Sequence, residues 1–315
     1  MSTSLAPSAY VQRRAEPHPR PGAVMAPVRL EIGLLPTALD YVFSSYWEER
    51  PAGGATQRTG IEKCFRLNTV PHPTGLVLDY TVTAPPVLRK PDLSALERAV
   101  LLLADLYQHL ELRLGANGQV LAVLNHPEVQ QTWKRVQAEL LNRAGGADAV
   151  TAQLLAGVAE QLAQPAGLLT SLRYDYLFAF LLKDIYQQRF EGELRYGQAQ
   201  VLPRFFADAD LWYWERLALM PAPAPGRVGL HLSGELDRAR TDVLAVVQHL
   251  RDAHEALTGV PAAASAHPAD LRLAYEATYE VDAATGWPVR VEASVRCWLP
   301  NLYSKEYFLR FELAT

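Results

Sequence analysis

Apolar and polar residues alternate most regularly near the C-terminus, in residues 271–281, 289–297 and 303–313. A period of two is typical of a strand that buries one side. Thr285 and Gly286 separate the first two segments and favour a turn. The pattern therefore predicts a three-stranded antiparallel meander with one apolar face and one charged, solvated face.

The same alternation predicts two hairpins in the first half of the chain. One joins strands at 64–67 and 76–83 through residues 72–75, and the other joins 110–114 to 120–124 through Asn117-Gly118. Asn-Gly suits the positive φ angles of a tight hairpin turn. Three further strands are expected at 194–202, 211–220 and 227–232.

Apolar residues at spacings of three and four predict helices between these strands. We expect them at 37–47, from Asp92 or Ser94 to Tyr107, and at 125–145, 151–164, 172–190 and 236–257. The segment 172–190 is so densely apolar that we expect it to be the central, almost wholly buried helix.

Together these elements predict the α+β class, with antiparallel sheets, segregated helices and the C-terminal meander packed on helices. We expect a disordered Pro/Ala-rich tail at 1–27, a mixed N-terminal lobe at 28–145 and a helical connector at 146–191. Residues 192–315 form the expected C-terminal sheet lobe with one helix.

Composition excludes several partners. The formal net charge is −4, so no strong positive field exists to hold nucleic acid. No stretch approaches the roughly 18–20 apolar residues of a membrane span, and no signal-peptide pattern opens the chain, so we expect a cytoplasmic protein without integral membrane association. Cys64 and Cys297 belong to no CxxC pair, which predicts free thiols.

The chain lacks the motifs of common catalytic and cofactor sites. GxGxxG, GxxxxGK[ST], GxSxG and HExxH are all missing, and the histidines are dispersed. We therefore expect no cofactor, no metal and no catalytic residue. Asp208 and Asp210 precede an aromatic run and leave a hydrolase as a minor alternative.

Four aromatic residues are the candidate binding site. Trp298 falls on the charged face of its strand, Tyr303 follows it closely, and Trp212 and Trp214 share one strand face. Exposed aromatic residues are typical of partner-binding surfaces. We expect a non-catalytic protein-binding component, of the adaptor, assembly or immunity type, whose partner is another protein or a second copy of itself.

Two alternatives stay open at the level of sequence. A curved antiparallel sheet over a buried helix is also the architecture of carriers that hold an apolar ligand in a sheet-lined cavity. A hydrolase using Asp208 and Asp210 is the second alternative. A continuous cavity favours the carrier, an exposed aromatic patch favours the adaptor, and carboxylates facing one cleft favour the enzyme.

Overall fold

The computed structural model describes residues 34–90, 101–143, 149–186, 194–206, 209–262 and 267–314. In these ranges one antiparallel sheet of eleven strands dominates, in the order β5-β4-β3-β2-β1-β11-β10-β9-β8-β7-β6. The strands are β1 (Ala38–Pro51), β2 (Gln57–His72), β3 (Gly75–Arg89), β4 (His109–Leu114), β5 (Val120–Val123), β6 (Leu194–Phe206), β7 (Ala209–Met220), β8 (Arg227–Leu236), β9 (Arg272–Asp282), β10 (Pro288–Leu299) and β11 (Tyr303–Leu313).

The predicted α+β class with separate sheets and segregated helices is wrong. Strands from 28–145 and from 192–315 lie in one sheet, because β1 pairs with β11, with Phe43 opposite Phe311. The C-terminal meander is continuous with the N-terminal strands through this pairing. Its two partners are far apart in the sequence, so local periodicity contains no sign of it.

The helix expected at 37–47 is also wrong, since these residues belong to β1. Tyr41 and Phe43 alternate on the buried side of the strand, whereas Val42 between them is exposed. Aromatic and β-branched residues favour a pleated, half-buried strand, and pairing on both sides of β1 outweighs the helical spacing.

The predicted hairpins are confirmed. β2 and β3 pair through the turn after His72, and β4 and β5 pair around Gly118, whose φ is +80°. The three C-terminal segments form β9, β10 and β11, and Gly286 in the first turn has φ +76°. β6, β7 and β8 continue the antiparallel order.

The observed helices differ more from the predicted ones than the strands do. They are η1 (Ala104–Tyr107), α2 (His126–Arg143), α3 (Ala149–Ala163), α4 (Pro165–Tyr174), α5 (Tyr176–Leu181), α6 (Val243–Thr258) and η2 (Pro268–Asp270). No single helix covers 172–190, because Asp175 is extended and caps α5 by accepting from the backbone N–H of Leu177 at 2.8 Å. Likewise α6 begins only after Asp242, which caps it.

Several predictions fall on residues outside the described ranges. They include the tail at 1–27, Asp208 and most of the helix expected to begin at Asp92 or Ser94. In the part of the chain that the structure describes, no helix is long and apolar enough to cross a membrane.

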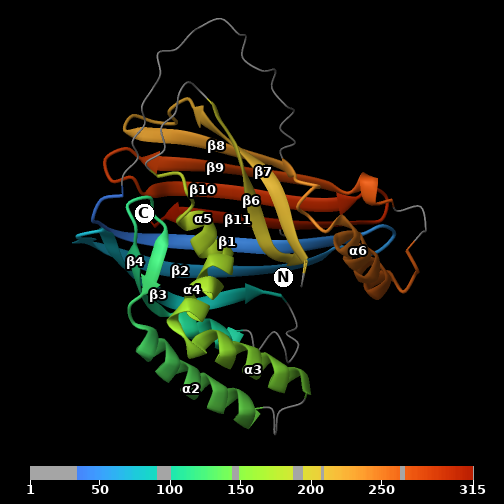
Figure 1. Cartoon of the computed structure of the whole chain (residues 1–315), viewed down its shortest axis with the longest axis horizontal. Helices are drawn as coiled ribbons and strands as arrows, with labels where there is room; N and C mark the ends of the chain where they lie inside the picture. Colours follow the sequence, from blue (N-terminus) through green and yellow to red (C-terminus); the bar gives the residue numbers. More distant parts are fainter. Residues whose placement is uncertain are drawn as a thin grey trace, which may run out of the picture.

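The helices α2 to α5 form a crossover between the two edges of the sheet. The edge strands are β5 and β6, which are consecutive strands in the sequence. The segment between them must therefore pass from one edge to the other. Figure 1 shows α4 and α5 running across one face of the sheet, with α2 and α3 beyond β3 and α6 near the far end of the strands.

We call the sheet face that α4 and α5 cover the inner face. Its buried residues include Phe65, Tyr275, Val295 and Phe311. The opposite, outer face carries charged residues in ion pairs, for example Arg66 with Asp40 at 2.8 Å. The apolar side of the sheet thus lies against the crossover, as the alternation predicts.

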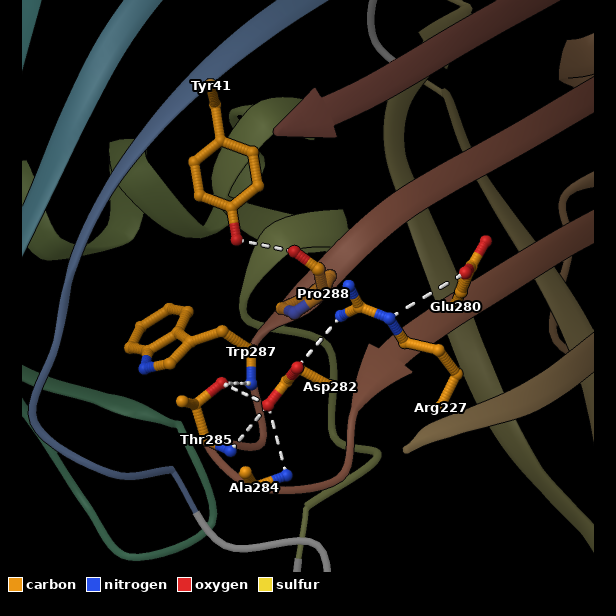
Figure 2. A network of polar contacts seen from close by, with 8 residues as sticks. All are labelled: Tyr41, Arg227, Glu280, Asp282, Ala284, Thr285, Trp287 and Pro288. Atoms are coloured by element: carbon orange, nitrogen blue, oxygen red, sulfur yellow. Dashed lines mark hydrogen bonds and ion pairs between the residues drawn. The ribbon is translucent and has the colours of Figure 1, made fainter. Parts of the chain in front are cut away.

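A polar network fixes the turn between β9 and β10 (Figure 2). Asp282 accepts hydrogen bonds from the backbone N–H groups of Ala284 and Thr285 at 3.0 and 2.9 Å, and from the Thr285 hydroxyl at 3.1 Å. Arg227 on β8 donates to the same carboxylate at 2.9 Å. The Thr285 N–H is the main reason that the pKa of Asp282 lies below its ordinary value.

The residues after this turn also anchor the beginning of the described chain. The Trp287 indole donates to the carbonyl of Leu35 at 3.0 Å. The Tyr41 hydroxyl donates to the carbonyl of Pro288 at 2.5 Å (Figure 2). Trp287 and Tyr41 are each 1% exposed. These contacts fix β1 against the C-terminal strands.

Candidate functional site

A cavity of about 550 Å³ lies between the crossover and the strands β6, β7 and β9. Its wall is mainly aromatic and aliphatic. The apolar and aromatic lining residues are Tyr174, Tyr176, Ala179, Phe180, Leu182, Val201, Leu202, Pro203, Tyr213 and Tyr275. Arg173, Lys183 and Asp184 are the charged residues of the lining, and Thr170 and Gln200 complete it.

The crossover creates this space because it is narrow. α5 spans only Tyr176–Leu181 and is joined to α4 at the extended residue Asp175. Two such short helices cannot cover the whole inner face. The Tyr176 hydroxyl donates to the carbonyl of Pro203 at 3.2 Å, which ties α5 to β6 and bounds the cavity on that side.

Two further cavities flank the same helices. One of about 420 Å³ reaches residues at both edges of the sheet, including Val120 and Ala199. It shares five residues with the first cavity, namely Arg173, Ala179, Leu182, Asp184 and Gln200. Since residues of both edges line one cavity, the sheet curls around the crossover. The other cavity, of about 320 Å³, lies against β1 and β2.

An aromatic cluster separates the first cavity from the one against β1. The Trp47 ring lies 4.5 Å from the Tyr307 ring and 5.9 Å from the Tyr176 ring, measured between centroids. Tyr176 lines both cavities. Aromatic rings in such contact give a large, rigid apolar wall.

A buried ion pair stands at the sheet side of the first cavity. Lys183 Nζ lies 2.6 Å from Glu215 Oε2, and the two side chains are 11% and 6% exposed. Burial disfavours the charged ammonium, but Tyr213 and Glu215 outweigh it, so the pKa of Lys183 lies above its ordinary value of 10.5. The Lys183 side chain therefore keeps its proton beside Glu215.

Two tyrosines complete this polar end. The Tyr213 hydroxyl donates to Glu215 Oε2 at 3.4 Å, and burial raises its pKa to about 12. The Tyr275 ring lies 4.6 Å from the Tyr213 ring and 6.1 Å from the Phe180 ring. The buried Tyr275 side chain also interacts with Tyr213 through a hydrogen bond between their hydroxyl groups. Burial raises the pKa of Tyr275 well above 10, so the hydroxyl keeps its proton.

Of the residues that the sequence singles out, Trp212 and Trp214 lie together on the outer face. Trp214 is 46% exposed and Trp212 is half-buried. The Arg240 guanidinium lies 5.7 Å from the Trp212 ring centroid and 5.6 Å from that of Trp214. Asp210, at the beginning of β7, is exposed.

The other two predicted binding residues lie on opposite faces. Trp298 is half-buried, with the Arg296 guanidinium 5.0 Å from its ring centroid. Tyr303 is buried at the beginning of β11. β8 and β9 lie between the strand of Trp298 and that of Trp212 and Trp214. The structure therefore brings Trp212 and Trp214 together and places Trp298 and Tyr303 apart from them.

Sequence reasoning missed the polar end of the cavity. Glu215 alternates with the buried Leu211, Tyr213 and Leu217, so the pattern places a carboxylate on the apolar side of β7. Lys183 stands in the densely apolar stretch at 174–185. A carboxylate and an ammonium on two apolar surfaces are a signal for a buried pair.

The described residues contain no group of three or more His, Cys, Asp or Glu side chains that could hold a metal ion. Cys64 and Cys297 are free, the first half-exposed and the second buried. The arrangement beside α5 thus offers an apolar wall, a buried ion pair and two buried tyrosine hydroxyls.

Comparisons with known proteins do not identify a family for this chain. No protein-family model and no curated protein matches the chain. One similar solved structure is described as "lipid-protein interactions in lipovitellin", with 8% sequence identity and a TM-score of 0.41. The match covers 88% of this chain and 25% of that chain, so the chain spans about a quarter of that protein's length. These values support no transfer of function.

Proposed function

We propose that the protein binds and carries a small apolar molecule in the cavity beside α5. The observation that carries the proposal is the cavity itself, about 550 Å³ in volume and walled mainly by aromatic and aliphatic side chains. Ligand sites are typically clefts of about 300–1,000 Å³ with a mostly apolar wall and a few placed polar groups. Lys183 and Tyr213 supply polar groups of that kind.

The flanking cavities add to this argument. The cavity of about 420 Å³ shares five wall residues with the first, so a ligand longer than the first cavity has room to extend along α5. Both cavities lie under the part of the crossover formed by α4 and α5, two short helices joined at Asp175. An extended junction is a position where such a cover can move to admit a ligand.

A dye titration tests the proposal. Nile red, an uncharged apolar dye, should bind the full chain with increased fluorescence. Ala179 lines both cavities, so Ala179→Trp should fill the space and weaken dye binding at least tenfold. Ala156→Trp on the exposed side of α3 is the matched control and should bind like the wild type. Equal affinity in both variants, or no binding by the wild type, would contradict the carrier function.

A second candidate function is the protein binding expected from the sequence. Exposed Trp214, with Trp212 and Arg240 beside it, is the observation in its favour. Tryptophan and arginine are the residues most enriched in binding hot spots. We propose this surface for a protein partner or for a second copy of the chain, in a cytoplasmic setting.

The oligomeric state of wild type and Trp214→Ala tests this second candidate. Sedimentation measures whether the full chain self-associates and whether the variant dissociates. If the wild type is a monomer, this surface does not bind a second copy of the chain. The hydrolase using Asp208 and Asp210 stays a prediction of the sequence.

A further inference from the structure

Lys63 is a charged residue on the apolar face of the sheet. On β2 it stands two residues from Ile61 and from the buried Phe65, and opposite it on β1 is the buried Phe43. Residues two apart along a strand point to the same face of a sheet. The Lys63 side chain therefore lies on the inner face, where it is half-buried.

Two other lysines on this side of the sheet have carboxylate partners. Lys183 Nζ lies 2.6 Å from Glu215 Oε2, and Lys305 Nζ lies 3.5 Å from Glu49 Oε1. Among the described residues Lys63 makes no ion pair, hydrogen bond or ring contact. Charges that are withdrawn from water are paired in native proteins, so the Lys63 ammonium is open to an anion.

Lys63 lines the cavity of about 320 Å³ that lies against β1 and β2. Most of the wall is apolar or aromatic and includes Phe43, Trp47, Ile61 and Tyr307. Among the described lining residues Lys63 is the one cation. The volume is at the lower end of the range of about 300–1,000 Å³ that is typical of ligand sites, so it suits a small molecule.

The pairing of β2 with β3 is irregular at Lys63. The register shifts between Glu62 and Cys64, the two neighbours of Lys63, where Pro85 and Pro86 of β3 lie. Proline has no backbone N–H to donate to a neighbouring strand. Irregular pairing of this kind re-aims side chains and is frequent next to active sites. Here it coincides with the one cation of the described cavity wall.

Asp175 is the anion of the same lining, and it has another partner. Its carboxylate accepts from the backbone N–H of Leu177 at 2.8 Å, which caps α5. In the described part of the chain no ion pair joins Asp175 to Lys63. Because like charges repel, Asp175 disfavours a ligand with two negative charges in so small a space. A ligand with a single negative charge fits this lining best.

We propose that this cavity is a further binding site, for a small monocarboxylic acid with an apolar tail. The carboxylate pairs with Lys63, and the tail lies against Phe43, Trp47 and Tyr307. The aromatic cluster around Trp47 separates this site from the cavity beside α5. The inference therefore does not depend on the proposed carrier function.

Titration with octanoate tests the site, and 1-octanol is the uncharged probe of the same chain length. Isothermal titration calorimetry of the full chain measures both affinities. We expect octanoate to bind about tenfold more tightly than 1-octanol, the order that one charge-assisted hydrogen bond supplies.

Variants then connect the preference to the residue. Lys63→Met removes the charge and keeps an unbranched side chain, so it should lower octanoate affinity about tenfold and leave 1-octanol affinity unchanged. The alcohol thus reports an intact cavity in the same sample. Lys63→Arg keeps the charge and should keep the preference for octanoate. Lys134→Met is the matched control, because Lys134 is exposed on α2 and outside the cavity lining, and it should bind like the wild type.

Three results would overturn the proposal. They are no binding of octanoate by the wild type, equal affinity for octanoate and 1-octanol, and a preference for octanoate that survives Lys63→Met. Ala179→Trp separates this site from the carrier cavity, because Ala179 lines the other two cavities and not this one. That variant should lose Nile red and retain octanoate. Loss of both ligands would place the acid beside α5 and contradict a site at Lys63.

Discussion

Lys183 and Glu215 form a buried ion pair that joins the helical crossover to the sheet, with 2.6 Å between Nζ and Oε2. Lys183 is the second residue after α5, and Glu215 lies on β7. A buried pair stabilises little relative to well-packed apolar residues, but one member without the other is strongly destabilising. The pair therefore fixes where the crossover meets β7.

Removing one member should destabilise the fold. We expect Lys183→Met to lower the free energy of unfolding by about 3–5 kcal/mol, because it leaves the Glu215 carboxylate buried and unpaired. The double variant Lys183→Met/Glu215→Leu should recover most of this loss. Urea unfolding measures both, and a single variant within about 1 kcal/mol of the wild type would contradict the prediction.

The same pair predicts a loss of stability at high pH. The pKa of Lys183 in the folded protein lies above its ordinary 10.5. A raised pKa stabilises the fold fully below the unfolded value, and the contribution is lost as the pH rises through the folded value. The difference in stability between wild type and the double variant should therefore be constant up to about pH 10 and change above it, as measured by urea unfolding in alkaline buffers.

Asp282→Ala should weaken the β9–β10 turn at neutral pH. The variant removes acceptors for the Ala284 and Thr285 N–H groups and for Arg227, and we expect a loss of about 1 kcal/mol. The pKa of Asp282 is lowered, so its stabilisation is present above the unfolded value of 3.8 and is lost as the pH falls through the folded value. Denaturant unfolding at pH 7 and below pH 3.8 should show the two proteins converging in acid.

Gly118→Ala should destabilise the β4–β5 hairpin beside the cavity. Its φ is +80°, and a Cβ there would lie 2.6 Å from Cδ2 of Tyr186. Gly226→Ala is the matched control, because Gly226 has φ +74° and no atom within 4 Å of the added Cβ. Both variants carry the backbone strain of about 1 kcal/mol, and the excess loss in Gly118→Ala measures the steric contact.

The sequence contained enough information for the local pairings. Asn117-Gly118 and the period-two segments at 271–313 specify hairpins through residues that are neighbours in the chain, and these predictions are confirmed. The strand β1 was predicted as a helix because its burial depends on β2 and β11 on its two sides. A strand paired with a distant segment leaves no local signal beyond its own composition.

The candidate site was harder to predict for the same reason. Aromatic residues such as Trp214 are visible as surface candidates from alternation alone, whereas the cavity needs α5, β6, β7 and β9 together. The helix expected at 172–190 is also interrupted at Asp175, so that it contains the end of α4 and the short α5. The polar end has two signals in the sequence, Glu215 on an apolar strand face and Lys183 in an apolar stretch.

The pairing of β1 with β11 has a consequence for biosynthesis. During translation β1 leaves the ribosome well before its partner β11, because Tyr303–Leu313 follows it far along the chain. Until β11 is made, β1 and β10 each expose an unpaired edge, and exposed edges of half-finished sheets are sites of intermolecular aggregation. The nascent chain is therefore open to strand pairing with other chains at these two edges until β11 is inserted between them.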